Sequence, residues 1–177
     1  MILALDVHYE ELAANTACVG LRSWPDASST LEVVERIEEP PAPYESGQFY
    51  KRELPHLHRV IERIRCALAV EVVIIDGHVW LGATEPGLGA HLHDALGGQI
   101  PVVGVAKSAF HGALATPVLR GESGRPLFVS AVAFDASRAA ELVRDMHGAH
   151  RVPTLLQRAD QLARRIAAPD LAKSLVV

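Results

Sequence analysis

The run at residues 70–75, Val-Glu-Val-Val-Ile-Ile, constrains the fold more than any other part of the chain. It is nearly continuous in β-branched residues, a pattern that is typical of a strand covered on both faces. The run ends abruptly, because Asp76 and Gly77 are residues that favour a turn. We therefore expect a central parallel strand with an aspartate at its carboxyl end.

The residues before this run predict three strands. Residues 1–7 are apolar apart from Asp6, and residues 16–24 and 31–37 are further β-tolerant runs. The sequence PDASS, a cluster of turn formers, separates the last two runs. Short connections of this kind favour an antiparallel meander.

The rest of the chain predicts helices and further strands. A helical period of apolar residues follows Pro55, which suits the first turn of that helix. GLGAHLHDALGG is typical of a short helix closed by glycine, IPVVGVAKS of a buried strand, and VLRGESGRPLFVSAVAF of a hairpin turned at residues 122–124. Two amphipathic helices follow, the second opened by Pro153. The order predicts an α/β fold, a mixed sheet flanked by helices, in one domain over residues 1–177.

Composition excludes several classes of protein. With 49% hydrophobic and 21% charged residues, the 177-residue chain is predicted to be globular and able to bury a core without staples. No apolar run approaches the roughly 20 residues of a membrane span, so no membrane is expected. Cys18 and Cys66 lie in or beside apolar runs, which predicts reduced core thiols and a cytoplasmic location. The net charge of −4 offers no general attraction for polyanions, so nucleic acid would need a local patch or metal ions.

Two aspartates occupy positions that favour a metal site. Asp6 interrupts an apolar strand, where a charge is costly unless it is paired, hydrogen-bonded or bound to a metal. If the first strand lies beside the central strand, Asp6 and Asp76 converge, with Glu53 as the natural third member. A hard cation such as Mg²⁺ or Mn²⁺ would then neutralise their repulsion. Taken separately, a solvated Asp6 near a strand end and a turn-forming Asp76 remain open interpretations.

Through nearly its whole length the chain resembles the endonuclease V family. ALDVHY is similar to that family's first-strand motif, PYESGQFYKRE to its Pro-Tyr-Ile-Pro-Gly…Arg-Glu segment, and VVIIDG to the motif with its second metal-binding aspartate. GLGAHL, PVVGVAKS, PLFVS and RVP…RADQLA follow in the family's order. The resemblance implies a ribonuclease H-like fold and Mg²⁺-dependent cleavage of DNA or RNA at deaminated purines, hypoxanthine or inosine, at the second phosphodiester on the 3′ side.

The resemblance also implies roles for individual residues. Three carboxylates match the metal-binding and catalytic acids, a lysine matches one near the substrate, and a tyrosine matches the wedge beside an extruded base. The residues expected to bind metal are Asp6, Glu53 and Asp76. Those expected to act in catalysis are the same three and Lys107. Those expected to contact the substrate are Tyr44, Gly47, Gly77 and Lys107.

The sequence departs from the family at three places. Residues 82–84 are Gly-Ala-Thr where the family has His-Pro-Arg, which removes a histidine and an arginine near the substrate. Ser46 replaces the proline of the wedge segment. Ala133 ends a Val-Ser-Ala-Val-Ala segment where the family has Val-Ser-Pro-Gly-His, which removes a histidine expected to assist the metal or water. Asp135 or His8 could substitute for it, although a helix N-cap is the expected role of Asp135.

Two other functions stay open at this point. A non-catalytic binding or interaction protein on an inherited nuclease fold would account for the missing histidine and the acidic charge, but not for the retained carboxylates. A nuclease with a different preferred substrate would also retain them.

His91 and His93 are poor metal ligands, because helical residues two apart point to different sides. The arginines near the last helix are expected to be solvated or to contact phosphate, and they are Arg151, Arg158, Arg164 and Arg165.

Overall fold

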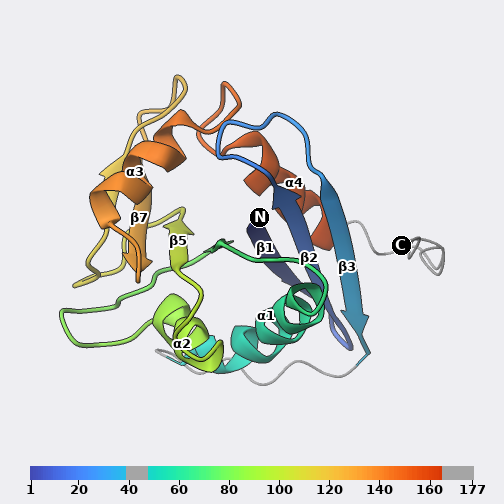
Figure 1. Ribbon diagram of the computed structural model, residues 1–177. Coiled ribbons are helices and arrows are strands. Elements are labelled where there is room, and N and C mark those ends of the chain that lie inside the picture. Colours follow the sequence, from blue (N-terminus) through green and yellow to red (C-terminus); the bar gives the residue numbers. More distant parts are fainter. Residues whose placement is uncertain (39–47, 165–177) are drawn as a thin grey trace.

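A mixed sheet forms the centre of the computed structural model, which describes residues 1–38 and 48–164 (Figure 1). The strands among these residues lie in the order β3-β2-β1-β4-β5-β7-β6. They are β1 (Ile2–Tyr9), β2 (Ala14–Leu21), β3 (Leu31–Ile37), β4 (Val72–Ile75), β5 (Val102–Ala106), β6 (Thr116–Val118) and β7 (Leu127–Val132). The helices are α1 (Phe49–Arg65), α2 (Leu88–Ala95), α3 (Ala136–Asp145) and α4 (Thr154–Arg164). The predicted α/β class is confirmed.

Strand pairing follows the sequence patterns closely. β1, β2 and β3 form the predicted antiparallel meander. β4 is parallel to β1 on one side and to β5 on the other, and all four of its residues are buried. β7 pairs antiparallel with both β5 and β6, which completes the predicted hairpin. The carboxyl ends of β1, β4 and β5 therefore meet at one edge of the sheet, the place where α/β sheets usually bind ligands.

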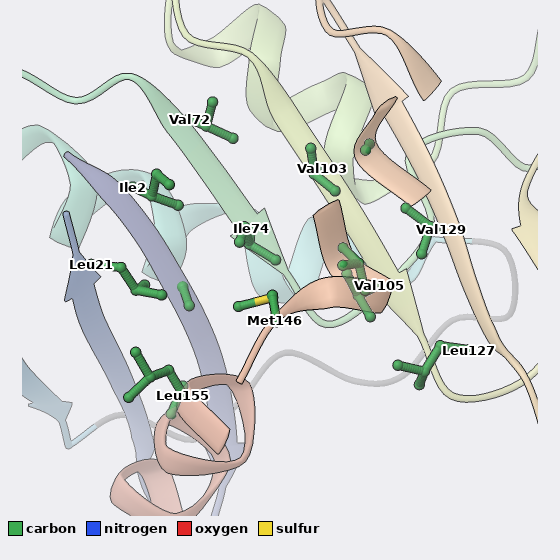
Figure 2. Close-up of a cluster of buried hydrophobic side chains, with 14 of the residues drawn as sticks. Ile2, Leu21, Val72, Ile74, Val103, Val105, Leu127, Val129, Met146 and Leu155 are labelled. Carbon is green, nitrogen blue, oxygen red and sulfur yellow. The ribbon is translucent and has the colours of Figure 1, made fainter. Parts of the chain in front are cut away.

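Helices cover both faces of the sheet, with α1 and α2 on one side and α3 and α4 on the other (Figure 1). Beneath α3 and α4, Met146 and Leu155 pack into a cluster of aliphatic strand residues that includes Ile74 (Figure 2). On the opposite face, Leu57 of α1 packs with Leu3 and others. Each fully buried side chain of this size contributes about 1.5–3 kcal/mol. Of the described helices, none combines the length and apolar character that crossing a membrane requires.

Helix α1 begins earlier than the sequence predicts. Its first residue is Phe49, so Pro55 lies inside the helix rather than in its first turn. An interior proline removes a backbone hydrogen bond and normally costs about 3 kcal/mol. Burial of Leu57 and Ile61 against the sheet offsets this cost. Glu53 consequently stands on a rigid helix and not in the segment that leads to one.

The two cysteines have different surroundings. Cys18 is buried in β2, and burial raises the pKa of its thiol. Cys66 is exposed just after the last residue of α1, so the prediction of a core thiol is wrong there. The reason is that the apolar stripe of α1 ends with Ile64, and the chain then turns to solvent.

Candidate active site

Pairing of β1 with β4 brings Asp6 and Asp76 together. In the parallel register Leu5 lies opposite Ile75, so the two aspartates follow at the next position of each strand. Asp6 is half-buried, and the charge of Asp76 is one of the influences on its pKa. Strand alternation places both aspartates on the sheet face that α4 covers, because Ala4 and Ile74 point to that face.

Glu53 reaches this edge of the sheet from α1, which lies on the face opposite α4. It is buried, with 6% of its surface exposed, and it projects from α1. Tyr9, at the end of β1, holds this part of the helix: its hydroxyl donates to the Arg52 carbonyl oxygen at 2.8 Å, and the Arg52 guanidinium lies 3.7 Å from the ring centroid. The same hydroxyl hydrogen-bonds the Glu53 carboxylate. Sequence patterns did not reveal Tyr9, since an aromatic residue in a strand is usually only a packing residue.

Lys107 follows β5 and forms an ion pair with Asp76. Its Nζ lies 2.6 Å from Asp76 Oδ2 and 3.9 Å from Oδ1 of Asp160, a residue of α4. Burial alone would lower the pKa of Lys107, but the hydrogen bond and charge of Asp76 outweigh it and the pKa is raised. Arg164 completes the group, with its Nε 3.0 Å from Asp160 Oδ1. Asp160 is a site residue that the sequence interpretation missed; the RADQLA segment was its only signal.

Burial and mutual repulsion make two of these carboxylates unusually weak acids. Burial, followed by the charge of Asp76, raises the pKa of Asp6 to about 7. Burial, followed by the charge of Asp6, raises the pKa of Glu53 to about 8. Lys107 and the Tyr9 hydroxyl act in the opposite direction on Asp6 and Glu53 respectively, without offsetting the desolvation. The ionised forms therefore need a further positive charge nearby.

The cluster opens into a cavity of about 490 Å³. Its lining includes the carboxylates, Lys107, Gly77 and His8, together with apolar and aromatic residues such as Tyr50, Leu88 and Phe110. Tyr50 is backed by His91, whose ring stacks on it with centroids 3.7 Å apart. Tyr44, Ser46 and Gly47, the expected wedge residues, lie outside the described residues.

The cluster fits a hard divalent cation in donor type and charge. Carboxylate oxygens are the ligands that Mg²⁺ and Mn²⁺ prefer, and a cation would relieve the cost of ionising Asp6 and Glu53. As the side chains stand in the described part of the chain, no three His, Cys, Asp or Glu residues are grouped closely enough to hold one. Two features account for this: Lys107 engages Asp76, and Glu53 approaches from the opposite helical layer.

Ala133 lies away from this cluster, contrary to the expectation that its position serves the site. β7 is antiparallel to β5, with Ser130 opposite Gly104 and Gly104 opposite Ile75. Ala133 is three positions beyond Ser130, so it lies about 13 Å along the strands from Asp76. Asp135 caps α3, where its Oδ1 accepts from the Arg138 backbone N–H at 2.6 Å. The absent histidine therefore removes no group from this cavity.

The remaining polar residues separate into structural and cavity residues. His91 and His93 contact different partners, since His91 stacks on Tyr50 and His93 Nδ1 lies 2.8 Å from the Ile100 carbonyl oxygen. Arg158 pairs with Glu32 of β3 through two contacts and is not among the residues that line the cavity. Arg165 lies outside the described residues.

Comparisons with known proteins identify relatives of this chain and of its fold. Residues 1–124 match the family model named Endonuclease V. The crystal structure of human ENDOV gives a TM-score of 0.75 at 24% identity, covering 92% of this chain and 82% of that one. Endonuclease V of Ciona intestinalis, in complex with a 24mer DNA containing an inosine followed by a ribo-adenosine, gives 0.78 at 21% identity, covering 92% and 83%. Endonuclease V of Streptomyces avermitilis gives 0.71 at 25% identity, covering 93% and 79%. No curated protein matches the chain. The fold is ribonuclease H-like.

Proposed function

The chain belongs to the endonuclease V family, a family of nucleases, and we propose that it is a metal-dependent endonuclease that cleaves nucleic acid at or 3′ to a deaminated purine. The observation that carries the proposal is the placement of Asp6, Glu53, Asp76 and Lys107 on one cavity of about 490 Å³. The Ciona relative, which is bound to inosine-containing DNA, supports the choice of substrate class.

Asp6, Glu53 and Asp76 would hold Mg²⁺, or Mn²⁺ in its place, with Asp160 beside them. When bound, such a cation supplies charge neutralisation at the scissile phosphate and acidifies water that can act as the nucleophile. Tyr9 keeps Glu53 directed toward the cavity by bonding both its carboxylate and the adjoining backbone.

The cavity also offers separate places for a phosphate and a base. The Lys107 ammonium can contact a phosphate oxygen as a point charge. Tyr50 and Phe110, two aromatic residues of the cavity lining, would pack against an extruded base and exclude water from it. Tyr44, in the segment before α1, would fill the space that the base leaves.

The proposal is tested with strands of DNA and RNA that contain or lack inosine, in Mg²⁺ or Mn²⁺. Wild-type protein is compared with Asp6→Ala and Asp76→Ala, and with Asp145→Ala, a matched change at an exposed residue of α3. We expect cleavage of the inosine strands by the wild-type and Asp145→Ala proteins alone. Cleavage by the wild-type protein no greater than that by Asp6→Ala and Asp76→Ala would refute the proposed endonuclease activity and favour the non-catalytic binding protein. Equal cleavage of strands with and without inosine would refute lesion specificity.

A further inference from the structure

The position of Lys107 raises a structural question, because a lysine side chain is a flexible stem with a mobile charge. Asp76 holds the ammonium group at the end of this side chain. The residue itself is the first after β5, where the sheet no longer fixes the backbone. Another contact must therefore fix the position of the Lys107 backbone at the edge of the sheet.

Arg151 makes the contact that does so. Its Nη2 donates to the Lys107 carbonyl oxygen, and also to the Pro126 carbonyl oxygen at 2.7 Å. Pro126 directly precedes β7, and Arg151 itself stands three residues before α4, the helix that carries Asp160. One guanidinium thus joins the end of β5, the start of β7 and the approach to α4.

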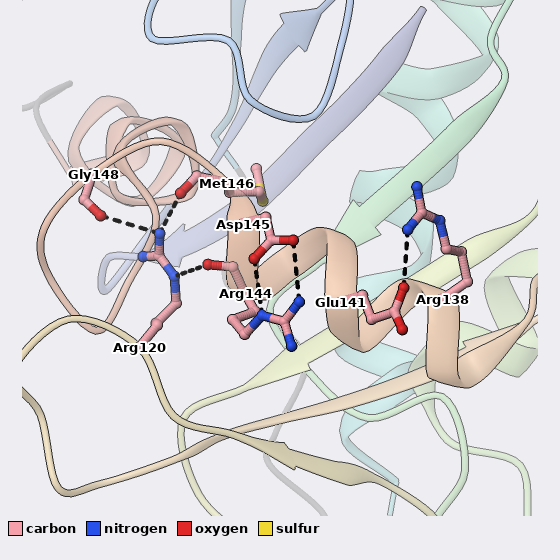
Figure 3. A network of polar contacts seen from close by, with 7 residues as sticks. All are labelled: Arg120, Arg138, Glu141, Arg144, Asp145, Met146 and Gly148. Carbon is pink, nitrogen blue, oxygen red and sulfur yellow. Dashed lines mark hydrogen bonds and ion pairs between the residues drawn. The ribbon is translucent and has the colours of Figure 1, made fainter.

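A second arginine, Arg120, contacts the connection between α3 and α4, from which Arg151 projects. Figure 3 shows its contacts with Arg144, Met146 and Gly148. Arg120 is buried, with 6% of its surface exposed, and within the described part of the chain its guanidinium donates to five main-chain carbonyl oxygens. Nη1 donates to His150 at 2.6 Å and Arg151 at 3.4 Å, and Nη2 to Met146 and to Gly148 at 3.2 Å. Nε donates to Arg144 at 3.3 Å, in the last turn of α3.

These contacts form a continuous path from a buried anchor to the cavity. Arg120 fixes the connection between α3 and α4, Arg151 extends from that connection to the Lys107 backbone, and Lys107 reaches Asp76 and Asp160. We propose that Arg151 is a positioning residue that sets where the Lys107 ammonium stands, with Arg120 as its support. This inference rests on the proposed nuclease function for its kinetic readout, though not for its structural one.

The kinetic test is a double-mutant cycle on cleavage of inosine-containing DNA in Mg²⁺, with Arg151→Met, Lys107→Met and both together. A displacement of a reacting group by about 1 Å can cost about 100-fold in rate, so we expect Arg151→Met to lower kcat by about 10- to 100-fold with a smaller change in KM. In the Lys107→Met background the same change should lower kcat by less than about 3-fold, because Arg151 acts through Lys107. Arg158→Met, an arginine bound to Glu32, is the matched control and should leave kcat unchanged.

Equal losses in the two backgrounds would show that Arg151 supports only the fold, and would overturn the inference. Arg151→Lys keeps a donor for the carbonyl oxygens, should regain most of the lost kcat, and serves if the methionine variant does not fold. A crystal structure of the Arg151→Met variant gives a readout without activity: we expect the Lys107 ammonium to leave Asp76, and an unchanged ion pair would overturn the inference. If wild-type protein cleaves nothing, the proposed function fails, while the crystal structure still decides the role of Arg151.

Discussion

Replacing Asp6 by asparagine should stabilise the metal-free protein while abolishing its proposed activity. Asp6 is half-buried within β1, one residue beyond the part of β1 that pairs with β4, and has a pKa of about 7, against an ordinary value of 3.8. Folding therefore favours its protonated form, which asparagine imitates. Because the pKa is raised, the metal-free protein loses stability as the pH rises from about 4 to about 7.

The magnitude follows from the shift of the pKa. Each pKa unit is worth 1.36 kcal/mol, so the raised pKa of Asp6 lowers the free energy of unfolding by up to about 4 kcal/mol at pH 8, where Asp6 is ionised in the folded protein. At pH 5 the loss is about 2 kcal/mol, because the folded protein keeps Asp6 protonated while the unfolded chain would ionise it. Asp6→Asn should remove this cost and also lower the pKa of Glu53, which the Asp6 charge raises. The gain in free energy of unfolding should thus be larger at pH 8 than at pH 5 by about 2 kcal/mol.

Urea denaturation in EDTA at the two pH values measures this difference. Asp145→Asn is the control, because the hydrogen bond from Arg144 lowers the pKa of Asp145 and its neutralisation should bring no gain at pH 8. A loss of stability in Asp6→Asn at pH 8, or an equal gain at both pH values, would refute the argument that burial makes the ionised form of Asp6 unfavourable.

Three further substitutions test other parts of the structure. Gly104→Ala should destabilise the protein by about 1–3 kcal/mol in urea denaturation, because the new Cβ would lie 2.4 Å from the Gly77 carbonyl oxygen; an unchanged midpoint would contradict this. Asp135→Ala should cost about 1 kcal/mol through the lost cap of α3 and leave cleavage unchanged, whereas slower cleavage would make Asp135 a substitute for the family histidine. Tyr9→Phe should cost about 1 kcal/mol and slow cleavage through Glu53, and a normal rate at reduced stability would limit Tyr9 to packing.

The sequence was sufficient to predict the sheet and its two aspartates, and the reason is local. β4 is a continuous buried run, and parallel pairing with β1 follows from a meander that precedes a helical crossover. Once those strands are neighbours, Asp6 and Asp76 must meet, because both follow the last paired residues. The sequence patterns left the pairing of β1 with β4 as a condition, and the structure confirms that pairing.

The residues that the sequence did not predict depend on contacts between distant elements. Asp160 enters the site because α4 packs over β1 and β2, and no local pattern in α4 indicates which strand it will cover. The sequence predicts the start of α1 too late, because proline usually marks the first turn of a helix. Burial of α1 against the sheet stabilises the helix enough to accommodate a proline in its interior. Ala133 was assigned to the site by motif order, although the antiparallel direction of β7 carries it to the other end of the sheet.

The charges at the cavity lead to a last prediction, on binding rather than cleavage. Four carboxylates face two cationic side chains there, and they are Asp6, Glu53, Asp76 and Asp160 against Lys107 and Arg164. When all are ionised this cluster repels a phosphate backbone, so we expect inosine-containing DNA to bind weakly in EDTA at pH 8 and more tightly with Mg²⁺ at equal ionic strength. Glu53, with a pKa of about 8, is only partly ionised at this pH. Glu53→Gln therefore removes part of one negative charge and should strengthen binding in EDTA, as followed by fluorescence anisotropy, whereas the exposed Asp145→Asn should not. Equal affinity of wild-type protein with and without the cation would show that the backbone contacts the protein away from the carboxylates, and that the cavity is not where the substrate phosphate lies.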